Sequence, residues 1–150
     1  MKNIALIKAN YGSKNFDFAL NLIFDEWGDG NKEHLKAKKQ SLKEDKITKC
    51  YVLILNSTPV GCFVICENDL KGYPEYNPNL ACVCVDKNFR GKGYSKILMQ
   101  KSNEMFRKLN IKTAYLKTNL INFYEKFGWV YVKNIKIDGE DEKLYVQNFE

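Results

Sequence analysis

Apolar residues recur along the chain with two spacings, and these spacings predict alternating strands and helices. Three stretches carry apolar side chains at the spacing of amphipathic helices: from 15 or 16 to 27, 31–46, and from the end of a glycine-bearing turn to about 109. Seven shorter stretches alternate apolar and polar residues or are continuously apolar, as strands are: 2–9, 49–55, 60–67, 80–85, 112–117, 130–137 and 142–149. The pattern indicates a mixed α/β protein.

The strand predicted over 80–85 is almost entirely apolar, which is typical of a strand buried on both faces. A long helix separates it from the strand over 112–117, so we expect the two strands to be parallel with a right-handed crossover. Ligands of such sheets bind at the carboxyl ends of the strands. The segment that follows residue 85 is therefore the first place to look for a site.

That segment is a basic turn with two glycines, Arg90-Gly91-Lys92-Gly93-Tyr94-Ser95, and it opens the third helix. The first N–H groups of a helix lack intrahelical partners and carry partial positive charge. Gly91 and Gly93 let the backbone approach a ligand closely, while Arg90 and Lys92 add formal charge. The turn is predicted to bind a pyrophosphate. A purely structural turn is the alternative, and the spacing matches neither a P-loop nor a dinucleotide fingerprint.

A second informative stretch contains the run Phe123-Tyr124-Glu125-Lys126-Phe127-Gly128-Trp129. Asn119 or Thr118 could cap the start of a short helix here, and Gly128 could end it. The aromatic side chains could equally serve as core packing.

Two motifs of this chain resemble those of the GNAT superfamily, the acetyl-CoA-dependent N-acetyltransferases. The pattern R-x-x-G-x-S, Arg90 to Ser95, resembles the family's R/Q-x-x-G-x-G/A signature, with Ser95 where Gly or Ala is usual. The run from Phe123 to Trp129 resembles its F/L-Y-x-K-x-G-F/W block, in the family's order. The resemblance is close over residues 80–131. In the rest of the chain it is limited to the order of the predicted helices and strands. It implies a GNAT-like acyl-CoA N-acyltransferase fold of one domain, 1–150, with a central twisted mixed sheet of about seven strands and helices on both faces.

The resemblance also implies roles for particular residues. Tyr124 matches the family's general acid, which protonates the leaving thiolate of coenzyme A. Asn119 matches a polar position that often contacts the cofactor, although a capping role would explain it equally well. The implied acetyl-CoA-binding residues are Val83, Cys84, Val85, Arg90, Gly91, Lys92, Gly93, Tyr94, Ser95 and Asn119.

The general base is left open by the sequence. Several relatives carry a glutamate eleven residues before the arginine of the turn, but this chain has Asn79 there, which cannot accept a proton. Glu67 is the first candidate, because partial burial beside apolar neighbours could raise its pKa. An exposed Glu67 without a catalytic role is an equally open alternative, and Asp69, Glu26 and water are the other candidates. His34 is expected to be an exposed helix residue, since its sequence neighbours suggest no dyad.

The composition limits the classes of partner and cofactor that the protein is expected to bind. The net charge of +6 would suit nucleic acid, but the basic residues are spread along the chain among 18 acidic ones, and an anionic cofactor suits the charge equally well. One histidine and five cysteines without a C-x-x-C pair exclude the usual metal sites and favour a reducing cytoplasm. No signal peptide or membrane span is expected.

The sequence therefore predicts an N-acetyltransferase that moves an acetyl group directly from acetyl-CoA to a primary amine of a small molecule or peptide. A homodimer is left open. The alternatives are a catalytically silent CoA-binding or sensor module of the same fold and a small basic nucleic-acid-binding domain.

Overall fold

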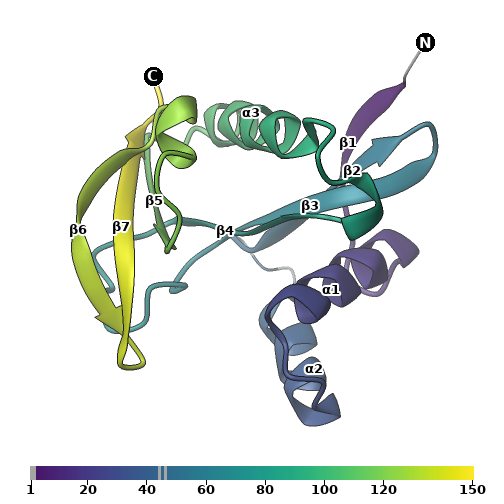
Figure 1. Cartoon of the computed structure of the whole chain (residues 1–150), viewed down its shortest axis with the longest axis horizontal. Coiled ribbons are helices and arrows are strands. Elements are labelled where there is room, and N and C mark those ends of the chain that lie inside the picture. The colour runs from purple at the N-terminus through teal and green to yellow at the C-terminus, as the bar shows by residue number, and fades with distance from the viewer. Residues whose placement is uncertain (1–2, 44, 46) are drawn as a thin grey trace. The chain divides into compact units, whose positions relative to one another are not determined.

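The computed structural model describes residues 3–43, 45 and 47–150, and Figure 1 traces their helices and strands. The elements are β1 (Ile4–Lys8), α1 (Lys14–Trp27), α2 (Lys32–Ser41), β2 (Lys49–Leu55), β3 (Thr58–Cys66), β4 (Asn79–Val85), η1 (Lys87–Phe89), α3 (Tyr94–Lys108), β5 (Thr113–Thr118), η2 (Tyr124–Phe127), β6 (Val130–Ile137) and β7 (Glu140–Asn148). The two η elements are short 3₁₀ helices. Within the described residues, no helix has the length and apolarity needed to cross a membrane.

The strands form a seven-stranded mixed sheet in the order β1-β2-β3-β4-β5-β7-β6. The pairing of β4 with β5 is parallel, as predicted, while β1 with β2, β5 with β7 and β6 with β7 are antiparallel. The predicted fold class is confirmed. The second helix is shorter than expected, because α2 ends at Ser41; the expected end of that helix also covers positions 44 and 46, which lie outside the described residues.

The two hairpin turns explain where the neighbouring strands begin. Asn56 and Ser57 have φ values of 48° and 72°, and Asp138 and Gly139 have 51° and 79°. Two consecutive residues with positive φ form the type I′ turn that matches the twist of a hairpin. Since such a turn needs only two residues, β3 starts at Thr58, two positions before the predicted start.

The chain separates into two compact units. Unit 1 comprises the residues up to 64 together with 82–98, and unit 2 comprises 65–81 together with 99–150. The division falls inside β3, β4 and α3.

In unit 1, helices cover both faces of the strands. The Ser13 hydroxyl accepts a hydrogen bond from the Phe16 N–H at 3.2 Å and starts α1, whose apolar face includes the buried Phe16, Leu20 and Ile23. Figure 1 shows α1 and the start of α3 on opposite sides of β2 and β3. A Cβ on Gly61 of β3 would come within 2.9 Å of Leu98 Cδ1 on α3, so glycine permits this close approach.

Unit 2 has an aromatic core and an adjoining aliphatic cluster. Phe106, Trp129 and Phe149 are buried, with ring centroids 4.8–6.3 Å apart. The aliphatic cluster consists of Leu70, Ile135, Ile137 and Leu144, with Tyr73, Tyr76 and Tyr115 packed against it. Trp129, the last residue of the second sequence motif, is therefore a core residue.

Candidate functional site

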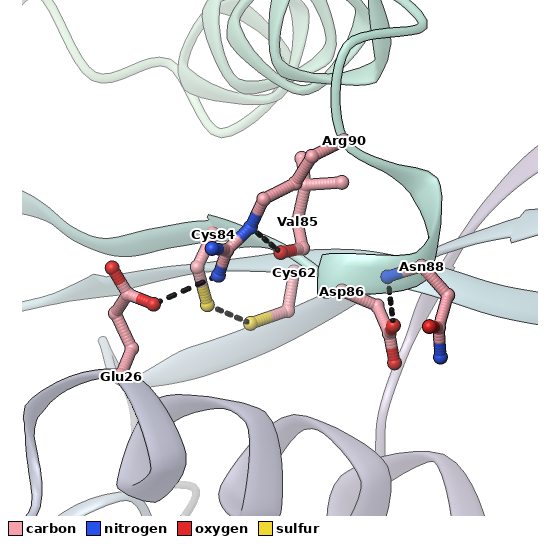
Figure 2. A network of polar contacts seen from close by, with 7 residues as sticks. All are labelled: Glu26, Cys62, Cys84, Val85, Asp86, Asn88 and Arg90. Atoms are coloured by element: carbon pink, nitrogen blue, oxygen red, sulfur yellow. Dashed lines mark hydrogen bonds and ion pairs between the residues drawn. The ribbon is translucent and has the colours of Figure 1, made fainter.

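The chain leaves β4 at Val85 and is anchored before it enters the glycine turn (residues 90–95). The Asp86 N–H donates to the Val60 carbonyl at 2.8 Å, which ties this point to β3. The Asp86 carboxylate accepts from the Asn88 N–H at 2.8 Å and caps η1, as Figure 2 shows. Both contacts hold the segment that leads into the glycine turn, and no local sequence pattern had singled out Asp86.

The glycine turn has the backbone that its sequence predicts. Gly91 and Gly93 have φ values of 75° and 86°, a region that side chains other than glycine rarely adopt. A Cβ built on either glycine meets no atom within 4 Å, so the approach to the main chain here is open. α3 starts at Tyr94, so Tyr94 and Ser95 of the glycine turn are also the first residues of the helix, and its first N–H groups lie at this end.

Arg90 is folded back against the protein. Figure 2 shows its guanidinium reaching beneath the end of β4 toward α1: Nε donates to the Val85 carbonyl at 3.1 Å, and Nη2 donates to Glu26 Oε2 at 2.9 Å. Both side chains stay accessible, at 53% for Arg90 and 40% for Glu26. Glu26, one of the candidate bases, is thus an ion-pair partner that joins α1 to the glycine turn.

The other side chains of the turn have distinct environments. Lys92 places its ammonium 5.7 Å from the centre of the Phe89 ring, a cation–π contact. The Tyr94 side chain is buried with its ring 6.3 Å from that of Phe89, so any cofactor contact of Tyr94 would come from its main chain. Ser95 is partly buried.

The cysteines of β4 lie in an apolar environment. Cys84 and Cys62 of the neighbouring β3 are buried with their sulfurs 3.6 Å apart, and this contact, together with burial, raises the pKa of Cys62. Burial also raises the pKa of Cys50, to about 12. Cys82 has a φ of 55°, which interrupts the extended conformation of β4 directly before Val83. Among the described residues, no group of histidine, cysteine or carboxylate side chains could hold a metal ion.

Tyr124 lies at the start of η2 in unit 2. Its ring is 4.9 Å from that of Phe123 and 6.2 Å from that of Tyr145. Burial raises the pKa of Tyr124 to about 12, and a hydrogen bond with the Thr118 side chain acts in the opposite direction. The phenol therefore keeps its proton at neutral pH.

The expected cap of the short helix is wrong. η2 begins at Tyr124, and the Thr118 hydroxyl instead accepts a hydrogen bond from the Leu120 N–H at 3.0 Å, closing a turn within the preceding loop. Asn119 is exposed beside it. Gly128 ends η2 with a φ of 93°, as predicted.

Asn79 has a structural role that its sequence position did not reveal. The residue is fully buried, and its amide nitrogen donates to the carbonyls of Tyr76 at 2.8 Å and Tyr115 at 3.3 Å. Its Oδ1 accepts from the Asp69 N–H at 3.0 Å. The side chain therefore pins the loop that precedes β4. Glu67, next to this loop, is exposed, which is one of the two alternatives that its sequence position left open.

The expectation that His34 has no dyad partner is also wrong. His34 Nδ1 lies 2.7 Å from Asp29 Oδ2, although His34 is exposed as expected. Asp29 Oδ1 accepts from the Asn31 N–H at 2.9 Å, and this hydrogen bond lowers the pKa of Asp29. An Asp shortly before a helix start, five residues ahead of a His, was the signal available in the sequence.

Comparisons with known proteins agree with this architecture. The family profile described as "Acetyltransferase (GNAT) domain" matches residues 46–131, more than half of the chain. A spermidine N-acetyltransferase chimera of SpeG from Vibrio cholerae and hSSAT is 18% identical, with 97% of this chain and 95% of that chain covered and a TM-score of 0.72.

Two further solved structures share the fold. A GNAT family acetyltransferase from Elizabethkingia anophelis with acetyl-CoA bound is 16% identical, with 97% and 98% covered and a TM-score of 0.68. A GNAT family acetyltransferase from Staphylococcus aureus is 20% identical, with 99% and 100% covered and a TM-score of 0.67. The profile match, supported by these folds, shows that the chain belongs to the GNAT family of acetyltransferases.

Proposed function

We propose that the protein transfers an acetyl group from acetyl-CoA to a primary amine of a small molecule or peptide, directly and in a ternary complex. The observation that carries this proposal is the glycine turn. Gly91 and Gly93 leave the main chain open at the start of α3, where a pyrophosphate can accept several N–H groups. These residues fit the cofactor that the family uses.

Acetyl-CoA, when bound, would supply an activated acetyl thioester. The residues proposed to hold it are the main chain of Val83, Cys84 and Val85 and the residues of the glycine turn, with Asn119 as a further polar contact. The contacts of Arg90 suggest that its side chain helps to fix the turn, whereas Lys92 supplies charge beside the pyrophosphate.

Tyr124 is proposed as the general acid. Its raised pKa of about 12 keeps a proton on the phenolic oxygen at neutral pH, which a leaving thiolate requires. The hydrogen bond with Thr118 restricts the direction of that oxygen.

Glu67 remains the proposed base, with Asp69 and water as alternatives. An amine acceptor with an ordinary pKa near 10.4 must lose a proton before it reacts. The exposed carboxylate of Glu67 can take up this proton directly or through water. The hydrogen-bond partners of Asn79 and Glu26 support structural roles for those two residues.

The free cysteines support a reducing cytoplasm as the location of the protein.

The second candidate is a catalytically silent CoA-binding module. It is favoured by one observation: the position that carries a glutamate in several relatives is here Asn79, whose amide is fully engaged in hydrogen bonds. Such a protein would bind acetyl-CoA without transferring its acetyl group.

The first test is thermal unfolding of the full chain with acetyl-CoA, with ATP and NAD as controls. A ligand at 100 times its Kd stabilises by about 2.7 kcal/mol, which raises Tm by several degrees for a domain of this size. We expect a shift with acetyl-CoA alone, followed by acetyl transfer in a panel of primary amines. The absence of a shift at millimolar acetyl-CoA would contradict the proposal, and a shift without transfer to any amine would favour the silent module.

A further inference from the structure

A pocket of about 280 Å³ lies between α1 and α2 in unit 1. Its walls include Ile23, Phe24, Trp27, Asp29, His34 and Lys38. This volume is near the lower end of the range for small-molecule sites. The pocket lies apart from the residues that the sequence motifs identify.

Its α1 wall is apolar and aromatic. Ile23 and Trp27 are four residues apart and therefore point to the same side of the helix. Ile23 is buried, but Trp27 is 58% exposed. A large aromatic side chain left exposed at a pocket is more informative than an exposed aliphatic residue, because its burial would be strongly favourable. This wall suits a ligand that has an apolar group about the size of an aromatic ring.

Its α2 wall is polar and positively charged. His34 and Lys38 are also four residues apart on one side of their helix. Because the ionised Asp29 carboxylate can only accept a hydrogen bond, His34 must donate its Nδ1–H to it. Asp29 uses its two oxygens for His34 and for the Asn31 N–H. The ammonium of Lys38 is the cationic group in the pocket lining that an anionic ligand can meet.

A residue next to the pocket on α1 contacts the glycine turn. Glu26, which immediately precedes Trp27 on α1, is the residue that binds Arg90 at 2.9 Å. Figure 2 shows this contact between the last turn of α1 and the start of the glycine turn. The same turn of α1 thus carries the aromatic wall of the pocket and the ion pair to the proposed cofactor site.

We propose that this pocket binds a small carboxylate with an apolar, ring-sized body, the carboxylate toward Lys38 and the body against Trp27 and Phe24. This inference rests on the proposed function in one respect: the ligand is the amine acceptor, an α-amino acid with an apolar side chain. Such a molecule combines the carboxylate, the body and the primary amine. An acceptor that is only cationic would leave the Lys38 ammonium without an anionic partner.

Binding can be measured through the fluorescence of Trp27. The chain has two tryptophans, and Trp129 is only 1% exposed, so acrylamide quenching reports mainly on Trp27. We expect L-phenylalanine and 3-phenylpropanoate to protect Trp27 from quenching. Phenethylamine, which lacks the carboxylate, and glycine, which lacks the ring, should not protect it. Equal protection by phenethylamine would overturn the inference.

Matched variants on α2 locate the carboxylate. Lys38→Gln should weaken phenylalanine binding by about tenfold, the effect of losing one charge-assisted hydrogen bond. Lys36→Gln is the control, since Lys36 is exposed and pairs with Glu33 at 4.0 Å. Unchanged binding by Lys38→Gln would contradict the assignment. Both variants alter exposed or half-exposed helix positions, and circular dichroism checks that they fold.

The same samples separate this inference from the proposed function. If acetyl-CoA raises Tm but phenylalanine does not protect Trp27, the pocket assignment fails and the proposed function stands. If phenylalanine protects Trp27 but acetyl-CoA produces no shift, the pocket binds the ligand as inferred, while the proposed function and with it the acceptor role of the ligand fail.

Discussion

At the scale of single residues, burial strengthens the hold of Tyr124 on its phenolic proton. An exposed tyrosine would have a pKa near 10, whereas burial raises the pKa of Tyr124 to about 12. The phenol is therefore a proton donor over the whole physiological range. A tyrosine with an ordinary pKa is also protonated at neutral pH, so the fold only extends the pH range over which Tyr124 keeps its proton.

Replacing Tyr124 with phenylalanine should lower kcat by about 100-fold or more, the usual contribution of a general acid. The Kd for acetyl-CoA should stay within about twofold, because the aromatic ring and its packing are kept. Steady-state kinetics and calorimetry measure the two quantities. Tyr131→Phe is the control, since the Tyr131 hydroxyl donates to the side chain of the nearby Asn134. Unchanged kcat in Tyr124→Phe would remove Tyr124 from catalysis.

The raised pKa of Tyr124 also predicts a pH effect on stability. The folded protein holds this proton more tightly than the unfolded chain, so the contribution is fully present below pH 10 and is lost as pH rises toward about 12. Urea unfolding should show wild type losing more stability than Tyr124→Phe over that interval. Parallel losses in both proteins would contradict the shift.

Asn79 is a residue whose amide cannot be replaced by a carboxylate. In Asn79→Asp, an acceptor would face the carbonyls of Tyr76 and Tyr115 in place of the N–H donors. We expect a loss of roughly 2–4 kcal/mol in the free energy of unfolding at neutral pH, measured in urea. Asn88→Asp, at an exposed position, should change stability far less.

At the scale of elements, the glycine turn combines a backbone requirement with a binding role. Gly93→Ala places a Cβ at a φ of 86°, which should cost about 1 kcal/mol of stability, and it should also weaken acetyl-CoA binding. Gly12→Ala is a matched control, because Gly12 has a φ of 83° and equally open surroundings. We expect both variants to lose similar stability in urea and only Gly93→Ala to lose acetyl-CoA affinity. Equal affinities would show that the turn is structural.

The ion pair between α1 and the glycine turn allows a second test at this scale. Because Arg90 and Glu26 are partly exposed, the pair should stabilise the fold by at most about 1 kcal/mol. Glu26→Gln should nevertheless weaken acetyl-CoA binding a few-fold if Arg90 positions the turn. Asp25→Asn, one position earlier on α1, controls for the change in net charge. If Glu26→Gln binds acetyl-CoA more tightly, Arg90 is instead a phosphate ligand that Glu26 restrains.

At the scale of the whole molecule, the buried thiols report on the integrity of the sheet. Cys50 and Cys62 are inaccessible; burial raises the pKa of Cys50, and the contact with Cys84 together with burial raises the pKa of Cys62, so little thiolate exists at pH 8. Iodoacetamide should leave these two cysteines unlabelled in the native protein and label them in urea, as peptide mass spectrometry can show. Labelling of Cys62 in the native state would indicate that β3 opens at equilibrium.

The sequence predicted the elements closely, because apolar spacing is a local property that both helices and strands display. The strands at Lys49–Leu55 and Val130–Ile137 have the predicted bounds. The errors arose where a local signal was ambiguous: Thr118 and Asn119 are both good caps, yet η2 starts at Tyr124. Glu67 continues the alternation of β3 but lies beyond its end, and it is exposed.

By itself, the sequence determined the strands, the helices, the glycine turn and the family, because hydrophobic period and glycine placement act over a few residues. Only the tertiary structure decided the partners of the polar side chains. Glu26 and Arg90 are 64 positions apart, and Asn79 and Tyr115 are 36 apart. A hydrogen bond needs its donor and acceptor within about 3 Å, and residues so distant in the chain reach that separation only after the strands and helices have packed.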